Sequence, residues 1–333
     1  MEPDLGLVRP SEEHTFLRCP EGTLDDLRPG MIAVVGVPFD ATKITRQGAK
    51  DGPNAVRHST TGSAARLKGD GLVDLDRDVR ITLRQPAPLV DLGNLVLAPT
   101  DVAAMIERVS ATVAAIIRRG AFPLVLGGDH FVAYPSTRGF ATAMREQNPN
   151  IRLGYVHVDQ HLDLNDHAPY WGKHHSGTPA RRITEIPGIE ETRMVFLGIN
   201  GPQPTDNAAF VRDSGVMVIP LSQVRREGIP TVMERVRETL RDCDAVYVSL
   251  DIDALDRSFA PGTGNTATIG GLFPMELLEI AAALRDLPLG AVDLAEVAPN
   301  WDPTGRTPAI GAAALFAILE PKLFAIEPFG LRG

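Results

Sequence analysis

Carboxylates and histidines occur in three short segments of this 333-residue sequence, and their spacing suits metal binding. In HVDQHLD, Asp159, His161 and Asp163 alternate with other residues directly after an apolar run at 153–158. Alternate side chains of an extended chain point to one side, so we expect these three groups to share a face. One imidazole and two carboxylates form a ligand set that suits Mn²⁺ or a similar divalent ion.

Two further segments extend this pattern. The run VYVSLDIDALD ends an apolar stretch with Asp251 and Asp253, at the place where strands of an open α/β sheet face a ligand crevice. The run LVLGGDH ends another with two glycines, which allow a tight turn, before His130. Six ligands are too many for one open catalytic ion but suit two ions about 3.5–4 Å apart that share a water. The predicted metal ligands are His130, Asp159, His161, Asp163, Asp251 and Asp253.

Each segment also has a purely structural interpretation. Taken alone, His130 could be a packed histidine after a glycine turn, and Asp251 and Asp253 could be a helix N-cap and a loop carboxylate. The DxHxD pattern after a buried strand favours metal binding more strongly. The occurrence of all three segments at strand ends argues against the structural interpretation.

The segments that position these residues alternate short apolar runs with longer amphipathic stretches, which predicts an α/β fold with a mainly parallel sheet covered on both faces. Neither a repeat nor a linker divides the chain, so residues 1–333 are predicted to form a single domain, with residues 1–28 as an N-terminal arm. Thr100 is the predicted N-cap of the first long helix. Strands are predicted over 31–36, 122–126, 153–158, 194–198, 216–220, 245–252 and 291–297, and helices over 100–119, 134–145, 230–241, 274–285 and 310–319.

Composition excludes several classes of protein. The net charge of −9, from 33 basic and 42 acidic residues, leaves no basic surface for nucleic acid or an anionic membrane. No apolar stretch approaches the roughly 18 residues of a membrane span, and the N-terminus lacks the features of a secretory signal. Cys19 and Cys243 do not have the spacing of a zinc or redox motif. We therefore expect a cytoplasmic protein.

The order and spacing of these motifs resemble the ureohydrolase family, which includes arginases, agmatinases, guanidinobutyrases and formimidoylglutamases. The resemblance covers nearly the whole chain after the N-terminal arm. It implies a three-layer α/β/α fold of the arginase type, two divalent ions per subunit, most often Mn²⁺ with Ni²⁺ or Co²⁺ as alternatives, and homotrimers or homohexamers. The matching blocks are GVPFD at 36–40, RQGAKDGPNAVR at 46–57, GGDH at 127–130, VDQHLD at 158–163, SLDIDALD at 249–256, APGTG at 260–264 and LAEVAPNWD at 294–302.

The resemblance also implies roles for individual residues. Asp159 and Asp251 would bridge the two ions, and a metal-bridging hydroxide would attack the guanidinium carbon, with Asp163 as proton shuttle. Glu296, in the LAEVAP block, would hold the guanidinium, for which a carboxylate is the natural partner. One ion would be held by His130, Asp159, Asp163 and Asp251, and the other by His161, Asp159, Asp251 and Asp253.

The sequence departs from the family pattern beside the expected substrate pocket. Where arginases and agmatinases carry a histidine before a glycine, the loop HHSGTPARR has Ser176, with His175 one residue earlier, so either residue could take that catalytic or substrate-binding role. The segment GTGNTAT at 262–268 replaces a proline-containing continuation. Asn165 would contact the far end of the substrate, and Trp171 could stack on a planar cation or anchor its loop.

We expect agmatinase-like cleavage of a small cationic guanidino substrate to urea and an amine, because Asp302 matches the agmatinase branch. Alternative substrates are guanidine, a guanidino acid, a biguanide and formimidoylglutamate. The chain could instead be a subunit of a hetero-oligomer whose active site lies in a homologous partner, but the six retained ligands argue against this. A metal-dependent deacetylase of related fold is a third interpretation, which the combined APGTG, LAEVAP and DxHxD blocks do not favour.

Overall fold

The computed structural model describes residues 7–8, 14–86, 88–265 and 270–331. At its centre is a nine-stranded sheet with the order β1-β5-β2-β6-β11-β10-β7-β8-β9. The edge strand β1 (Leu7–Val8) is antiparallel to its neighbour, and all other pairs are parallel. The remaining strands are β2 Ile32–Gly36, β5 Leu89–Leu95, β6 Phe122–Leu126, β7 Leu153–Val158, β8 Ile189–Ile199, β9 Met217–Pro220, β10 Ala245–Asp251 and β11 Leu289–Ala295.

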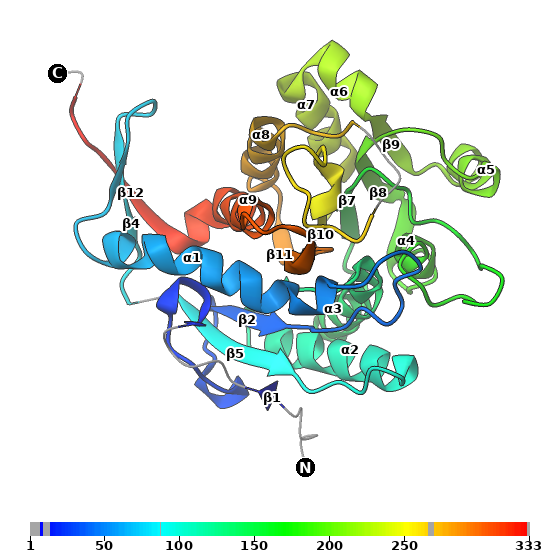
Figure 1. Ribbon diagram of the computed structural model, residues 1–333, viewed down its shortest axis with the longest axis horizontal. Helices are drawn as coiled ribbons and strands as arrows, with labels where there is room; N and C mark the ends of the chain where they lie inside the picture. Colours follow the sequence, from blue (N-terminus) through cyan, green and yellow to red (C-terminus); the bar gives the residue numbers. More distant parts are fainter. Residues whose placement is uncertain (1–6, 9–13, 87, 266–269, 332–333) are drawn as a thin grey trace.

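Helices cover both faces of this sheet (Figure 1). One layer contains α1 (Gly52–Lys68), α6 (Leu221–Glu227), α7 (Ile229–Leu240), α8 (Pro274–Leu284) and α9 (Arg306–Leu323). The other contains α2 (Val102–Arg118), α3 (Ala133–Gln147), α4 (Pro179–Ile183) and α5 (Thr205–Ser214). In β2, Ile32 and Val34 pack with the first layer, and Ala33 and Val35 pack with the second. Burial on both faces explains why the strands are continuous apolar runs, and the predicted α/β/α fold is confirmed.

The seven predicted strands and five predicted helices are all present; β6 and β7 have the predicted bounds, and the others are shifted at one or both ends. The predicted N-cap of α2 is wrong: the cap is Asp101, whose side chain accepts a hydrogen bond of 2.9 Å from the Ala104 backbone N–H, rather than Thr100. A carboxylate at this position reaches an amide of the first turn that has no partner within the helix.

Two central elements, β5 and α1, were not predicted because polar residues interrupt their apolar patterns. Arg57 of α1 donates two hydrogen bonds to Asp91 of β5, from Nε at 2.8 Å and from Nη2 at 2.9 Å, and both residues are almost completely buried. A paired, hydrogen-bonded charge can be buried where a single one cannot. This pair therefore fixes α1 over the sheet at positions that look solvent-exposed in the sequence.

The second, smaller sheet was not predicted either. Its order is β12-β4-β3, all antiparallel, and β12 and β4 project beyond α1 and α9 in Figure 1. Its strands are β3 (Leu72–Asp74), β4 (Val79–Leu83) and β12 (Phe324–Pro328).

The predicted N-terminal arm covers residues 1–28, of which 1–6 and 9–13 lie outside the described residues. Within the rest, Phe16 and Leu17 are fully buried, and their backbone N–H groups donate to Asp91 at 2.9 Å and to Thr60 at 2.7 Å. This segment is therefore fastened to β5 and α1. Among the residues that the structure describes, none of the helices has the length and apolar composition that crossing a bilayer requires.

Candidate metal centre

Four neighbouring strands in the middle of the large sheet bring the candidate site residues together. The strands β6, β11, β10 and β7 lie side by side in this order and are parallel, so their carboxyl ends meet at one edge. His130 follows β6, Glu296 follows β11, and Asp251 is the last residue of β10. The DxHxD segment follows β7. Residues far apart in the sequence thereby face one cavity.

The local path of the DxHxD segment differs from the expected extended chain. β7 ends at Val158, and Asp163 has φ +49°, a left-handed conformation that is uncommon for residues other than glycine. The Asp159 carboxylate accepts a hydrogen bond of 2.7 Å from the His161 backbone N–H, which folds the segment into a turn. The three side chains therefore converge through this turn, and the predicted strand alternation was wrong.

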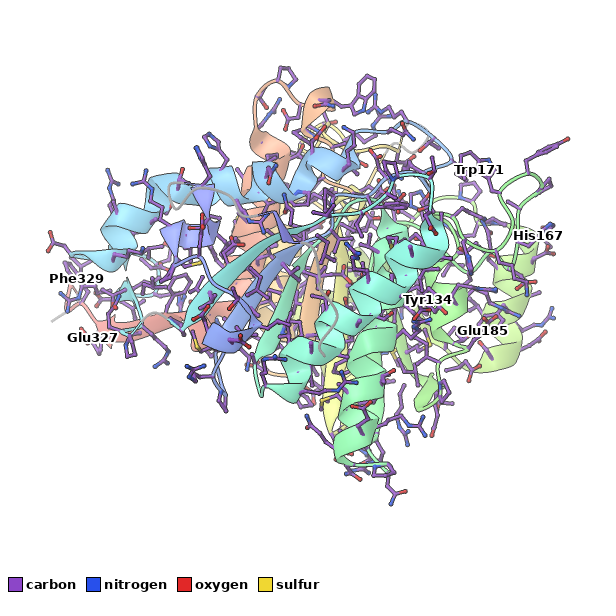
Figure 2. All side chains as sticks on the ribbon, turned by 90° about the horizontal axis from the view of Figure 1, so that it is seen from below. Tyr134, His167, Trp171, Glu185, Glu327 and Phe329 are labelled. Carbon is purple, nitrogen blue, oxygen red and sulfur yellow. The ribbon has the colours of Figure 1, made fainter. Side chains whose placement is uncertain are left out.

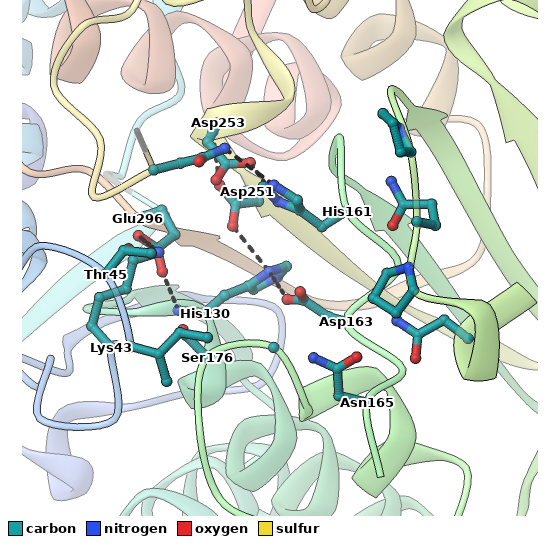
Figure 3. Close-up of a pocket in the computed structure, with 17 residues that line it drawn as sticks. Lys43, Thr45, His130, His161, Asp163, Asn165, Ser176, Asp251, Asp253 and Glu296 are labelled. Carbon is teal, nitrogen blue, oxygen red and sulfur yellow. Dashed lines mark hydrogen bonds and ion pairs between the residues drawn. The ribbon is translucent and has the colours of Figure 1, made fainter. Parts of the chain in front are cut away.

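The first group of ligand atoms surrounds His130. Its Nδ1 lies 3.1 Å from Asp159 Oδ2, 3.0 Å from Asp163 Oδ2 and 3.0 Å from Asp251 Oδ2 (Figure 3). All four side chains are buried. One imidazole nitrogen cannot satisfy three carboxylates, so the cluster requires additional positive charge.

The second group joins His161 to Asp253 and again to Asp159. His161 Nδ1 lies 3.1 Å from Asp159 Oδ1 and 3.4 Å from Asp253 Oδ1. Asp159 therefore faces both groups, one with each carboxylate oxygen. This is the arrangement that a carboxylate bridging two cations requires.

The cluster fits divalent metal ions because three of its buried ligand atoms make no hydrogen bond. Asp159 Oδ2, Asp253 Oδ1 and His130 Nδ1 are buried and make no hydrogen bond. Buried polar atoms are normally satisfied, and an oxygen-rich set with two imidazoles matches Mn²⁺ and its neighbours. The six predicted ligands lie together and could hold two such ions.

Electrostatics leads to the same conclusion. Burial, then repulsion by Asp253 and Asp159, raises the pKa of the Asp251 carboxyl well above its usual range. Burial alone would lower the pKa of His130, but Asp251, Asp159 and Asp163 outweigh it and hold that pKa well above the ordinary value. Without metal, the cluster therefore retains protons that bound cations would displace.

A buried hydrogen-bond chain orients His130, and it was not predicted. His130 Nε2 lies 2.9 Å from Ser249 Oγ, which donates to Asp293 at 2.8 Å, and Tyr247 donates to the other oxygen of Asp293 at 2.7 Å. Ser249 and Asp293 are register partners on β10 and β11. With Nε2 occupied by this contact, Nδ1 is left to face the cluster, as metal-binding histidines require.

A second unpredicted residue, His157, supports Asp159. The His157 ring stacks on that of His130 with centroids 4.8 Å apart, and its Nε2 lies 3.0 Å from Asp159 Oδ2. The side chain is fully buried. The sequence signal was its position two residues before Asp159 in HVDQH, although a histidine inside an apolar strand equally suggests packing.

We expect Ser249→Ala to weaken metal binding about 10–100-fold, because His130 would lose the contact that orients its ring. Competition with a chelator of known affinity measures the change. Ser110→Ala is the matched control: it also removes a buried hydroxyl, which donates 2.8 Å to the Pro135 carbonyl away from the cluster. Equal metal affinities of the two variants would show that Ser249 does not support His130.

The cavity above the cluster has a volume of about 180 Å³, so it admits a small ligand. Lys43 and Glu296 lie on one side of it and Asn165 on the other (Figure 3). Ser176 also lines the cavity. The predicted substrate contacts Glu296, Asn165 and Ser176 are therefore brought to the cavity together with five of the six predicted metal ligands.

Three other residues singled out in the sequence do not line this cavity. Trp171 is 45% exposed and lies at the periphery of the molecule (Figure 2). His175 is fully buried, and its Nδ1 accepts a hydrogen bond of 3.1 Å from the Gly177 backbone N–H. Asp302 accepts a hydrogen bond of 2.6 Å from the Thr307 backbone N–H, so it holds the start of α9.

Ser176 lines the cavity and His175 does not, so we expect substitution of Ser176, rather than of His175, to affect turnover directly. We expect Ser176→Ala to lower kcat/KM about 2–10-fold at unchanged metal content, which is the effect expected when one hydrogen bond to the substrate is lost. His175→Ala should instead lower the melting temperature, because it empties a buried space. Kinetics and thermal unfolding of both variants test this. The assignment fails if His175→Ala has the larger effect on rate at unchanged stability.

Comparisons with known proteins agree with this geometry. The model of the Arginase family matches residues 31–320. Guanidinopropionase from Pseudomonas aeruginosa is 34% identical over 312 residues, which cover 92% of this chain and 90% of the relative. Mitochondrial agmatinase from Gallus gallus is 33% identical over 288 residues, 86% of this chain and 79% of the relative. The structure of proclavaminate amidinohydrolase from Streptomyces clavuligerus superposes with a TM-score of 0.78 at 30% identity, covering 95% of this chain and 97% of that chain.

Proposed function

Because the chain belongs to the arginase family, we propose that it is a metal-dependent hydrolase that cleaves a C–N bond of a guanidino compound. The observation that carries this proposal is the convergence of six candidate metal ligands, five of which line one cavity that also contains a buried carboxylate, Glu296. A carboxylate beside a metal cluster is suited to orient a planar group rich in N–H donors.

Different residues of the cavity would have different roles in hydrolysis. The six-residue cluster would hold two divalent ions, which when bound acidify a shared water and so supply a nucleophile at neutral pH. Asp163 lines the cavity and is positioned to accept a proton from the nucleophile and to return it to the leaving nitrogen. Glu296 would orient the guanidino group, and Ser176 and Asn165 would contact the rest of the substrate.

The relatives bear on the substrate class. Guanidinopropionase, at 34% identity, and agmatinase, at 33%, are named for two guanidino compounds that differ in the rest of the molecule, and proclavaminate amidinohydrolase is also 33% identical. We propose an agmatinase-like reaction that releases urea and an amine, with guanidine, a guanidino acid, a biguanide or formimidoylglutamate as alternative substrates. We further propose that the native ion is Mn²⁺, with Ni²⁺ or Co²⁺ as alternatives, and that the protein is cytoplasmic. We also propose that it assembles as a homotrimer, a homohexamer or a hetero-oligomer with a homologue.

A substrate panel tests the proposed reaction. Protein loaded with Mn²⁺, Ni²⁺ or Co²⁺ is incubated with agmatine, guanidine, guanidino acids, a biguanide and formimidoylglutamate, and urea, formamide and ammonia are measured separately. We expect metal-dependent urea release from at least one guanidino compound. Formamide release from formimidoylglutamate alone would move the reaction outside guanidino chemistry, and no release from any compound with any ion would contradict the proposal.

A further inference from the structure

Lys43 lies in the cavity and pairs with the carboxylate proposed to hold the guanidino group. We propose that Lys43 determines specificity: by neutralising Glu296, it favours guanidino compounds whose reacting group is uncharged and carries a hydrogen-bond acceptor over permanently protonated alkylguanidinium ions. This inference rests on the proposed function and refines its substrate class: it keeps the proposed bond cleavage but disfavours agmatine, an alkylguanidinium ion, as the substrate. Electron-poor guanidines, such as those with a nitro or cyano substituent, have the required chemistry.

The contact places a cation directly against the Glu296 carboxylate. Lys43 Nζ lies 2.7 Å from Glu296 Oε2, and the two side chains are 8% and 1% exposed (Figure 3). Glu296 Oε1 accepts a hydrogen bond of 3.0 Å from the His130 backbone N–H. A guanidinium pairs best with a carboxylate through two parallel hydrogen bonds, one to each oxygen. Here Oε1 already accepts from the His130 backbone and Oε2 faces the Lys43 ammonium group, so a guanidinium bound through both oxygens would lie beside a second cation.

The loop that carries Lys43 is fastened on both sides. The backbone N–H and hydroxyl of Thr42 donate to Asp129 at 3.0 and 2.6 Å, and the Thr42 carbonyl accepts a hydrogen bond of 3.0 Å from Ser176. Thr45 donates 2.8 Å to the Gly264 carbonyl. Lys43 is therefore held over the cavity by its backbone, unlike a lysine of a free surface loop.

Space for the ion pair depends on Gly264. A Cβ atom at this position would lie 2.6 Å from Lys43 Cε and 3.2 Å from Glu296 Oε2. It would also lie 2.6 Å from the Arg46 carbonyl oxygen, and both short distances are below those of real Cβ contacts, so a larger residue would clash with the Lys43 loop. The absence of a side chain at Gly264 thus accommodates the pair.

Charge balance explains why this pair affects selectivity. The four aspartates of the cluster match the charge of two divalent ions, which leaves Glu296 as the remaining carboxylate of the cavity. Among the described residues that line it, Lys43 is the sole lysine or arginine. Burial lowers the pKa of Lys43, and the largest attraction that opposes this effect and raises the pKa is that of Glu296, whose Oε2 lies 2.7 Å from Nζ.

An arriving guanidinium ion would therefore meet an ammonium group beside a neutralised carboxylate. Two like charges that lie close together in a buried site repel strongly. The ammonium group has three donors, of which Glu296 uses one, so a substrate oxygen or nitrogen acceptor could bind another. An uncharged, acceptor-bearing guanidine avoids the repulsion and gains this contact.

The test compares two probes of similar size, methylguanidinium and N-nitroguanidine, by calorimetric titration of the metal-loaded protein. In Lys43→Met, we expect methylguanidinium to bind at least tenfold more tightly, about 1.4 kcal/mol, and nitroguanidine to bind more weakly. Lys50→Met, which removes an exposed lysine of the same segment, should change neither affinity. Unchanged or weaker methylguanidinium binding in Lys43→Met would overturn the proposal.

Lys43→Gln guards against misfolding of the methionine variant, because it keeps a donor beside Glu296 and removes only the charge. Both variants must retain the parent metal content and a cooperative unfolding transition. The gain for methylguanidinium should be smaller when Lys43→Met is made in a Glu296→Gln background, since no carboxylate is then freed. Equal gains in both backgrounds would contradict competition for Glu296.

Failure of this inference is distinguishable from failure of the proposed function. Urea release by the parent protein tests the reaction, whereas the ratio of the two probe affinities tests Lys43. A parent protein that hydrolyses guanidino compounds but whose probe ratio is unaffected by Lys43→Met would retain the function and refute the inference.

Discussion

Asp253→Asn is expected to abolish turnover, with a fall in kcat of about a thousandfold or more, equivalent to about 4 kcal/mol of transition-state stabilisation. Asp253 Oδ1 is buried, makes no hydrogen bond and lies 3.4 Å from His161 Nδ1. The asparagine has nearly the same shape but is neutral, so the ion beside His161 would lose an anionic ligand. Elemental analysis and kcat, measured on the same preparation, should show that metal content falls with turnover.

Asp256→Asn is the matched control for this prediction. Asp256 belongs to the same SLDIDALD segment, but its carboxylate accepts a hydrogen bond of 2.8 Å from Ser258 and does not line the cavity. The control should keep full metal content and rate. If Asp253→Asn also kept both, Asp253 would not be a metal ligand.

Glu296→Gln has the second-largest expected effect. We expect kcat/KM for a guanidino substrate to fall about 10–100-fold, the value of a hydrogen bond to a charged group, with metal content unchanged. Glutamine keeps an acceptor for the His130 backbone N–H but removes the negative charge, and it leaves Lys43 without its partner. Steady-state kinetics together with metal analysis separate substrate binding from metal binding.

The position of Glu296 explains why metal content should survive this change. Its carboxylate contacts Lys43 and the His130 backbone, not the atoms of the two ligand groups. Glu296 also has φ +66°, a strained backbone conformation of the kind found at functional sites. A variant with parent kcat/KM would refute the role proposed for Glu296, and one that loses metal would place it among the ligands.

Much of the fold could be predicted from apolar periodicity alone. Strands such as β6 are uninterrupted apolar runs because helices cover both faces of the sheet. β5 and α1 could not be recognised in this way, since their stability depends on the buried pair of Arg57 and Asp91. Such a pair joins residues far apart in the sequence and leaves no local signal in either segment.

The candidate ligands could be predicted because parallel strands end at one edge of a sheet. Three strand-end segments with acidic residues and histidines must then meet, whatever the detailed turns. The turns themselves were beyond prediction, as the left-handed conformation of Asp163 shows. The pairing of Ser249 with Asp293 also required knowing that β10 and β11 are neighbours.

The burial of Lys43 beside Glu296 could not be predicted from the sequence. A lysine in a loop rich in polar residues is ordinarily exposed, and nothing in GVPFDATK indicates burial. Its position over Glu296 results from the fastening of its loop to Asp129 and Ser176. The glycine that makes room for it stands more than two hundred residues later in the chain, at position 264.

The central claim is that two divalent ions, held by six side chains from three turns of the chain, carry the reaction. Elemental analysis of purified, catalytically active protein tests it most directly, combined with removal of metal by a chelator and its replacement. We predict two divalent ions per chain, loss of turnover on removal and its recovery when the second equivalent is restored. Full activity of protein shown to be free of metal would contradict the account.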